Sequence, residues 1–204
     1  MKNGLFCLFV LCSLACPVFA GNTDEKIFFP GEPSFGAQIF GNLNGKEMVA
    51  VGAKWARIDI VWSSIEKGEK GKYDFSHLDK QIAHYVDNGM NILGLLGYHY
   101  HCPLYSDPKE DMDAAIKGYA DFARACVERY KGKVAIWELG NEPEVFSVYK
   151  KPADYTRLAR AAAKAVREVD KDVHVGVLST AWMDRPFILS SLQEGLLSDG
   201  TVDV

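Results

Sequence analysis

Short apolar runs alternate with longer amphipathic segments along most of this chain. The apolar runs are rich in β-branched residues, which is typical of strands in a buried parallel sheet. Between them, apolar residues recur at helical spacing, so that each segment has one apolar face. The pattern predicts five β-α units with parallel strands and helical crossovers, the strands being residues 34–40, 56–61, 91–98, 133–139 and 173–180.

Start and stop signals support the helices. Ser76 with Asp79 three residues later is a capping-box pattern, and Gly89 is placed to end the same helix. Gly132 ends the next helix in the same way, and Pro152 lies near the first turn of a third.

Such a series forms either a barrel or a doubly wound sheet. The residues after the first strand, 40–45, lack the GxGxxG turn of a doubly wound dinucleotide site. The pattern therefore favours an α/β fold of the (β/α)₈ TIM-barrel type, with about the first five βα units present. We expect residues 21–204 to be the N-terminal portion of such a catalytic domain, truncated before strand seven.

The first twenty residues differ from the rest. Lys2 precedes an apolar run, and Val18-Phe19-Ala20 fits the small-x-small rule of signal peptidase. The run is shorter than the roughly 20 residues of a membrane span, so a signal peptide at 1–20 is favoured over an anchor, and Cys16 lacks the preceding pattern of a lipoprotein. We expect a secreted or periplasmic protein beginning at Gly21, with no membrane association after cleavage.

Charge and cysteine content limit the classes of partner and cofactor that this protein is expected to bind. The net charge is −4 with acidic and basic residues interspersed, so no basic stripe predicts nucleic-acid binding. Only Cys102 and Cys126 lie outside the leader, which is no disulfide framework. Cys126 falls on an apolar helical stripe and is expected in the core; a bridge to Cys102 is the less favoured alternative. No cofactor is implied, and His99 with His101 lacks a third ligand for zinc.

Chemistry in a barrel is located where strands end. The strand end that is most informative about chemistry is Trp137-Glu138-Leu139-Gly140-Asn141-Glu142-Pro143-Glu144. Pro143 is expected to hold Glu142 extended, with its carboxylate at the barrel mouth. Asn141 beside it offers an amide donor and acceptor. An amide beside a carboxyl suits sugar chemistry, in which one group holds a hydroxyl and the other protonates the glycosidic oxygen; the plainer interpretation is a turn.

Three other carboxylates are candidates for a catalytic role beside or in place of Glu142. Glu138 has the same inward parity but lies roughly 13 Å deeper at about 3.3 Å per residue, so we expect it to pair with Arg57 in the interior. Glu144 lies beyond the proline, in the loop, and is expected to be a rim or solvent carboxylate. Asp59 shares the parity of Arg57 and is a weak candidate for a second catalytic carboxylate.

These residues resemble a known family. Gly52 to Asp59, Trp62, Ile65-Glu66, and Gly71 to Phe75 are similar to the second βα unit of clan A glycoside hydrolases such as families 5 and 39. Residues 137–144 are similar to their fourth-strand motif, and the resemblance covers roughly residues 34–204. One departure is Lys67, where many relatives have proline.

The resemblance implies a retaining glycoside hydrolase acting on an oligo- or polysaccharide. Glu142 would be the acid/base, Asn141 would bind the 2-hydroxyl, and Arg57 would support the carboxylates. His99 matches a position that often lines the subsite of the reacting sugar. The nucleophile, a glutamate on strand seven in this clan, would lie downstream of this chain, so this fragment alone is expected to be inactive.

Two aromatic residues at strand ends are candidate substrate-binding platforms. Trp62 and Trp182 could each stack on a pyranose, or could simply anchor loops. Two other classes of protein remain as alternatives: a non-catalytic carbohydrate-binding or inactive relative on the same barrel, and a phosphate-binding barrel enzyme, which has no positive support.

Overall fold

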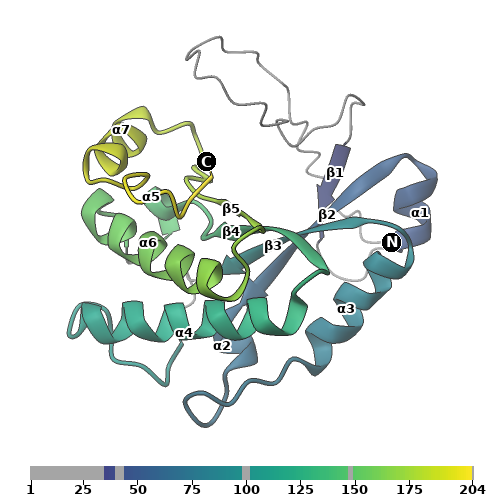
Figure 1. The fold of residues 1–204 in the computed structure, drawn as a ribbon, viewed down its shortest axis with the longest axis horizontal. Helices are drawn as coiled ribbons and strands as arrows, with labels where there is room; N and C mark the ends of the chain where they lie inside the picture. Colours follow the sequence, from purple (N-terminus) through teal and green to yellow (C-terminus); the bar gives the residue numbers. More distant parts are fainter. Residues whose placement is uncertain (1–34, 40–43, 98–101, 147–148, 204) are drawn as a thin grey trace, which may run out of the picture.

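The computed structural model describes residues 35–39, 44–97, 102–146 and 149–203. Strands and helices alternate as the sequence predicts (Figure 1). The strands are β1 (Phe35–Gln38), β2 (Ala53–Val61), β3 (Asn91–Gly97), β4 (Val134–Leu139) and β5 (His174–Gly176). The helices are α1 (Gly45–Ala50), α2 (Trp62–Ile65), α3 (Ser76–Asp87), α4 (Met112–Tyr130), α5 (Pro143–Phe146), α6 (Pro152–Val169) and α7 (Arg185–Gln193).

The strands form one sheet in the order β1-β2-β3-β4-β5, and every neighbouring pair is parallel. Sequential order in a parallel sheet is the arrangement of a (β/α) barrel, in which each crossover moves one strand along. A doubly wound sheet would reverse direction at a switch point, and this sheet does not. Beyond β5, the backbone N–H of Asp203 donates to the carbonyl of Val175 at 2.9 Å.

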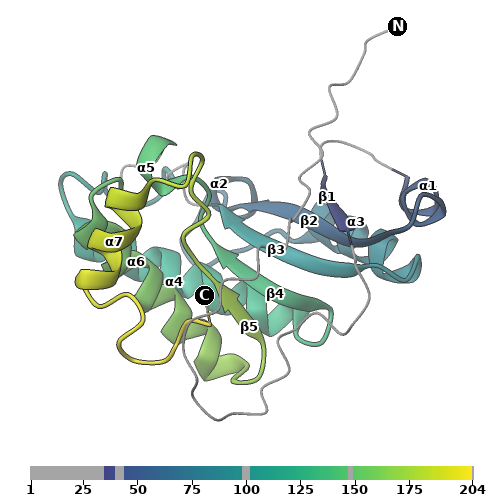
Figure 2. The same ribbon diagram turned by 90° about the horizontal axis from the view of Figure 1, so that it is seen from above.

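The hydrophobic core lies between the sheet and the helices that cover one of its faces (Figure 2). Along β2, Ala56, Ile58 and Ile60 are buried toward these helices, while Arg57 and Asp59 alternate with them and are more exposed. This alternation follows from the two-residue period of a strand. It leaves a second face that carries polar side chains, which is the face that a barrel turns inward.

The boundaries depart from the sequence prediction mainly at β5. The predicted strand ran through residues 173–180, but the observed strand ends at Gly176. Leu178 has a φ of 61°, a left-handed conformation that no regular strand contains. Thr180 N–H then donates to the Leu178 carbonyl at 2.7 Å, which closes a tight turn. The short helices α1, α2 and α5 were also not predicted.

One helix cap differs from its prediction. Ser76 is the first residue of α3, and its N–H donates to the Asp74 carboxylate at 3.0 Å. Asp79 makes no capping bond in the structure but accepts from Arg129 and Tyr130 of α4. The predicted helix stop is confirmed, because Gly89 has a φ of 77°, a conformation that glycine adopts at no steric cost.

Both cysteines of the described residues are buried free thiols, and Cys126 lies in the core as predicted. Within the same residues, no helix combines the length and apolar character needed to cross a membrane.

Candidate active site

The turn after β4 brings the predicted acid/base to the carboxyl end of the sheet. Glu142 is half-buried, and its backbone has a φ of 47°. Its N–H donates to the Ser179 carbonyl at 2.7 Å, and its own carbonyl accepts from Val145 at 3.0 Å. The expectation of an extended Glu142 is therefore wrong: Pro143 opens α5, and the turn between strand and helix requires a left-handed residue. Such a conformation costs a residue with a side chain about 1–3 kcal/mol and is concentrated at functional sites.

Arg57 is the centre of a polar network on the inner face. Its Nε donates to Glu138 Oε2 at 2.8 Å, and its Nη2 donates to Glu138 Oε1 at 2.6 Å. Nη2 also donates to Asn141 Oδ1 at 2.8 Å, and Nη1 donates to Gln38 Oε1. The predicted pairing of Arg57 with Glu138 is thus confirmed in bidentate form, a geometry that the planar guanidinium favours.

Carboxylates keep this arginine charged. Burial alone would lower the pKa of Arg57, but the hydrogen bond and charge of Glu138, with smaller contributions from Asp59 and Glu142, raise it above its ordinary value. Glu142 and Asp59 are therefore both within electrostatic reach of the same guanidinium. Asn141 uses its oxygen to accept from Arg57, so its Nδ2 is the group left to donate to another molecule.

Gln38 is a member of this network that sequence reasoning missed. It pairs in register with Arg57 across β1 and β2, which places the two side chains on the same face. A polar residue within the first apolar strand was the available signal, because a buried amide needs a partner.

Glu144 also differs from its prediction. It lies in α5 and is half-buried rather than open to solvent, and its Oε1 accepts from the Ala181 N–H at 2.5 Å. Its Oε2 is buried without a hydrogen-bond partner within the described part of the chain. Glu144 therefore joins the helix after β4 to the loop after β5.

The two candidate platforms have opposite environments. Trp62 is 1% exposed, and its ring stacks on Phe122 with centroids 5.9 Å apart and an interplanar angle of 18°. Its Nε1 donates to the buried Glu66 carboxylate at 2.5 Å. No face of Trp62 is open to a sugar. The prediction that Trp62 is a platform for a sugar ring is therefore wrong, and the alternative, that it anchors a loop, is correct. Trp182, after β5, is 83% exposed. His99 and His101 lie outside the described residues.

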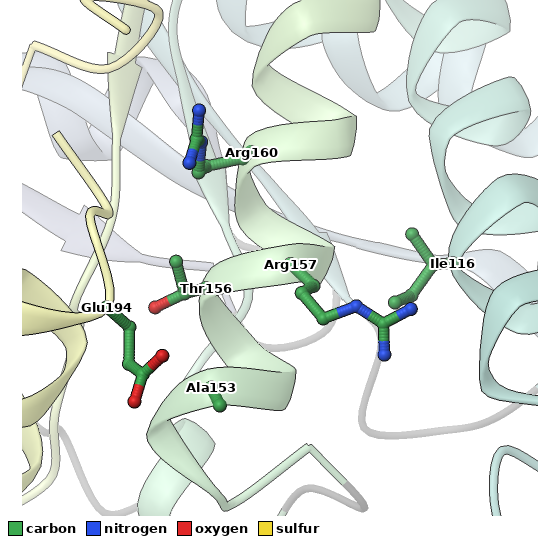
Figure 3. A pocket seen from close by; sticks show the side chains of 6 residues that line it. All are labelled: Ile116, Ala153, Thr156, Arg157, Arg160 and Glu194. Atoms are coloured by element: carbon green, nitrogen blue, oxygen red, sulfur yellow. The ribbon is translucent and has the colours of Figure 1, made fainter. Parts of the chain in front are cut away.

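Two hollows in the described part of the chain lie away from the Asn141-Glu142 pair, one in the outer helical layer and one at the carboxyl end of β2. One of about 380 Å³ is lined by Ile116, Ala153, Thr156, Arg157, Arg160 and Glu194 on the outer helical layer (Figure 3). Its arginines already pair with Asp113 and Asp199, and its remaining charged side chain is the exposed carboxylate of Glu194. A second hollow of about 820 Å³ borders α3 and includes Asp59 and His84. Among the described residues, no group of three histidine, cysteine or carboxylate side chains is placed to hold a metal ion.

A sequential parallel sheet, helices on one face and an Asn-Glu pair at the exit of the fourth strand define a (β/α)-barrel of the glycoside hydrolase type. Residues 38–192 match the family model described as Cellulase (glycosyl hydrolase family 5). The chain belongs to glycosyl hydrolase family 5.

Several solved structures have the same fold as this chain. Endoglucanase Cel5A from Thermotoga maritima matches with a TM-score of 0.54 and 21% identity, over 74% of this chain and 46% of that one. Pseudomonas stutzeri endoglucanase Cel5A, in complex with cellobiose, matches with a TM-score of 0.51 and 25% identity, over 64% and 39%. A family 39 glycoside hydrolase from Bacteroides cellulosilyticus WH2 matches with a TM-score of 0.52 and 22% identity, over 66% and 28%.

This chain therefore spans less than half the length of these structures. Its fold is the N-terminal part of their (β/α)₈ barrel, as the sequence predicts. No curated protein sequence matches the chain.

Proposed function

We propose that this chain forms the N-terminal part of a retaining glycoside hydrolase, with Glu142 as its general acid/base. The observation that carries the proposal is the Asn141-Glu142 pair at the exit of β4, in a chain of family 5. Arg57 holds Asn141 from β2, and the Ser179 carbonyl holds the backbone of Glu142 from the β5 side. The Asn141 side chain and the Glu142 backbone are thus held before a substrate binds, which supports catalysis by positioning.

The reaction takes place in two displacements. In the first, a carboxylate nucleophile attacks the anomeric carbon, the glycosidic C–O bond breaks, and Glu142 donates its proton to the departing oxygen. In the second, Glu142 takes a proton from water, the water oxygen bonds to the anomeric carbon, and the ester bond to the nucleophile breaks. Asn141 donates from Nδ2 to the neighbouring sugar hydroxyl, because its oxygen is occupied by Arg57.

The nucleophile of this proposal is a second carboxylate about 5–5.5 Å from Glu142, from a strand beyond β5. Asp59 on β2, two strands away from β4 in the sheet, is the alternative within this chain. A protein of residues 21–204 that hydrolyses an aryl glycoside would favour Asp59, whereas activity that depends on residues beyond 204 supports the first assignment.

The substrate is proposed to be an oligo- or polysaccharide. The Pseudomonas stutzeri enzyme was solved with cellobiose and the Thermotoga maritima enzyme with mannotriose, so cello- and manno-oligosaccharides are the first substrates to assay. Exposed Trp182 is a proposed platform for one sugar ring, since an aromatic face packs against the apolar face of a pyranose. His99 is proposed to contact the reacting sugar.

The test is Glu142→Ala in the active protein. It should lose most activity on substrates with poor leaving groups and much less on activated aryl glycosides, so that a covalent intermediate accumulates. Added azide should restore turnover, since a small anion attacks without a general base, and NMR should show retained anomeric configuration. A Glu142→Ala protein as active as wild type on a natural linkage, or an inverted product, contradicts the mechanism. Binding of oligosaccharide with no turnover by any form indicates the non-catalytic alternative.

Export is part of the same proposal. Cleavage of residues 1–20 would give a mature protein beginning at Gly21, and N-terminal sequencing of exported material checks it. An intact Met1 on protein recovered from the periplasm or medium would count against cleavage.

A further inference from the structure

Two loops at the carboxyl end of the sheet are joined by two hydrogen bonds. The first bond runs from the Glu142 N–H to the Ser179 carbonyl at 2.7 Å. The second runs from the Ala181 N–H to Glu144 Oε1 at 2.5 Å. The loop after β5 is thus held at two nearby points by the segment that carries the proposed acid/base.

Glu144 makes this connection although part of its carboxylate is buried without a hydrogen-bond partner in the described part of the chain. A carboxylate that is withdrawn from water costs free energy unless its oxygens are hydrogen-bonded. One oxygen of Glu144 is satisfied by Ala181, while Oε2 is buried without a partner within the described residues. A short apolar or neutral side chain would avoid this cost, so the placement indicates that the bond to Ala181 has a positional purpose.

The loop that Glu144 holds is a strained one. Within the described residues, the non-glycine positions with positive φ are Glu142 at 47°, Leu178 at 61° and Met183 at 53°, and all three lie at these two strand ends. The Tyr155 hydroxyl accepts from the Leu178 N–H at 2.8 Å, which fixes the start of the loop. Backbone in sparsely populated regions persists only when surrounding contacts hold it there.

Trp182 is the residue that follows this anchor. Trp182 is 83% exposed and Met183 is 80% exposed, so neither residue is held in place by packing. The position of the Trp182 backbone therefore depends on the bond one residue before it. An exposed indole beside the acid/base segment is a surface on which the apolar face of a neutral sugar ring can rest.

We propose that Glu144 is a positioning residue that sets the loop bearing Trp182 relative to Glu142, and thereby sets the affinity for a sugar unit next to the cleaved bond. Glu144 itself touches no substrate in this proposal and acts through the Ala181 N–H. The inference about affinity rests on the proposed glycosidase function, whereas the inference about loop position does not.

The test compares Glu144→Met with Glu144→Gln. Methionine keeps the length of the side chain and its packing but provides no strong acceptor, while glutamine keeps a carbonyl oxygen for Ala181. The protein is labelled with 5-fluorotryptophan, and the resonance of Trp182 is assigned from a Trp182→Phe variant. Glu128→Gln, at an exposed site on α4, is the control.

Glu144→Met should shift or broaden the Trp182 fluorine resonance and leave the signals of buried Trp62 and Trp137 in place. Glu144→Gln and the control should resemble wild type. A Trp182 signal unchanged in folded Glu144→Met overturns the proposal, and so does an equal perturbation by glutamine and methionine, since the acceptor would then not be the cause.

Kinetics tests the second half of the proposal separately. Glu144→Met should raise KM and lower kcat/KM about tenfold, the size expected for one lost charge-assisted hydrogen bond, with a smaller change in kcat. In a Trp182→Ala background the same change should have almost no further effect, because the loop would have lost the group that it positions. If Glu144→Met and Trp182→Ala instead reduce kcat/KM independently, so that their fold-changes multiply, the proposal that Glu144 sets the affinity through Trp182 is wrong. If a protein that also contains the strand with the nucleophile has no glycosidase activity, only the proposed function is refuted, because the fluorine measurement needs no turnover.

Discussion

The carboxylate of Glu66 joins two loops at the carboxyl end of the sheet, and replacing it tests how much this join contributes to stability. Glu66 is 1% exposed. Its oxygens accept from Trp62 Nε1 and the Gly71 N–H, both at 2.5 Å, and from the Tyr105 hydroxyl at 3.0 Å. An ionised carboxylate donates nothing and can accept all three bonds. Trp62 and Gly71 precede α3, while Tyr105 follows β3, so this one group holds both loops.

Glu66→Gln changes the shape of the side chain little but replaces one acceptor by an NH₂ group. That group must face either the Trp62 N–H or the Gly71 N–H, and two donors cannot bond to each other. One buried donor is then left without a partner at a cost of about 1–3 kcal/mol, and the remaining bonds lose their charge assistance. Removal of a buried charge recovers part of its desolvation cost. The net loss expected in the free energy of unfolding is therefore about 3 kcal/mol.

Urea unfolding followed by circular dichroism measures this loss. With a slope of about 2 kcal/mol/M, the midpoint should fall by about 1.5 M. Tyr105→Phe removes one bond and leaves the ring, so its loss should be about half as large, roughly 1.5 kcal/mol. The matched control is Glu69→Gln, a side chain that is 66% exposed and pairs with Lys72; it should change stability by less than about 0.5 kcal/mol. A Glu66→Gln midpoint equal to that of Glu69→Gln would refute the reasoning.

Two further predictions concern thiols and tryptophans. Burial raises the pKa of both Cys102 and Cys126, so these thiols should resist alkylation at pH 8 in folded residues 21–204. A thiol titration of the same protein in urea should detect two free thiols, whereas detection of none would reveal a disulfide bridge. Trp62→Ala should lower the free energy of unfolding by about 3–5 kcal/mol because it leaves a cavity in the core. Trp182→Ala should change the free energy of unfolding by less than about 0.5 kcal/mol, and it should weaken oligosaccharide binding measured by calorimetric titration. Equal unfolding midpoints for the two variants would contradict the burial contrast.

The order of strands and helices was predictable because the period of apolar residues reports which face of each element is buried. The pairing of Arg57 with Glu138 was predictable for a related reason. Both residues lie at inward positions of strands in a parallel sheet, and a buried arginine needs an acceptor. Periodicity and charge together were therefore sufficient for this pair, although they did not identify Gln38 as a further partner of Arg57.

Conformations at the strand ends were not predictable in this way. The burial of Trp62 depends on Phe122, Tyr119 and Tyr105, which are distant in sequence, and no local pattern reports such contacts. Glu142 was expected to be extended because a proline follows it, but a hydrogen bond to Ser179 and the start of α5 stabilise a left-handed backbone instead. Tertiary contacts override local preference at the positions where the chain turns.

The same contacts explain how the Asn141-Glu142 pair is held. Arg57 on β2 reaches the side-chain oxygen of Asn141 across β3, while its other nitrogens are fixed by Glu138 and Gln38. The backbone of Glu142 is held from the opposite side, through Ser179 in the loop after β5. The two neighbouring residues are therefore oriented by strands on opposite sides of β4, and a change on either side would move one relative to the other. Lysine could not replace Arg57 in this role, because a single ammonium cannot donate along the fixed, forked directions that these three partners require.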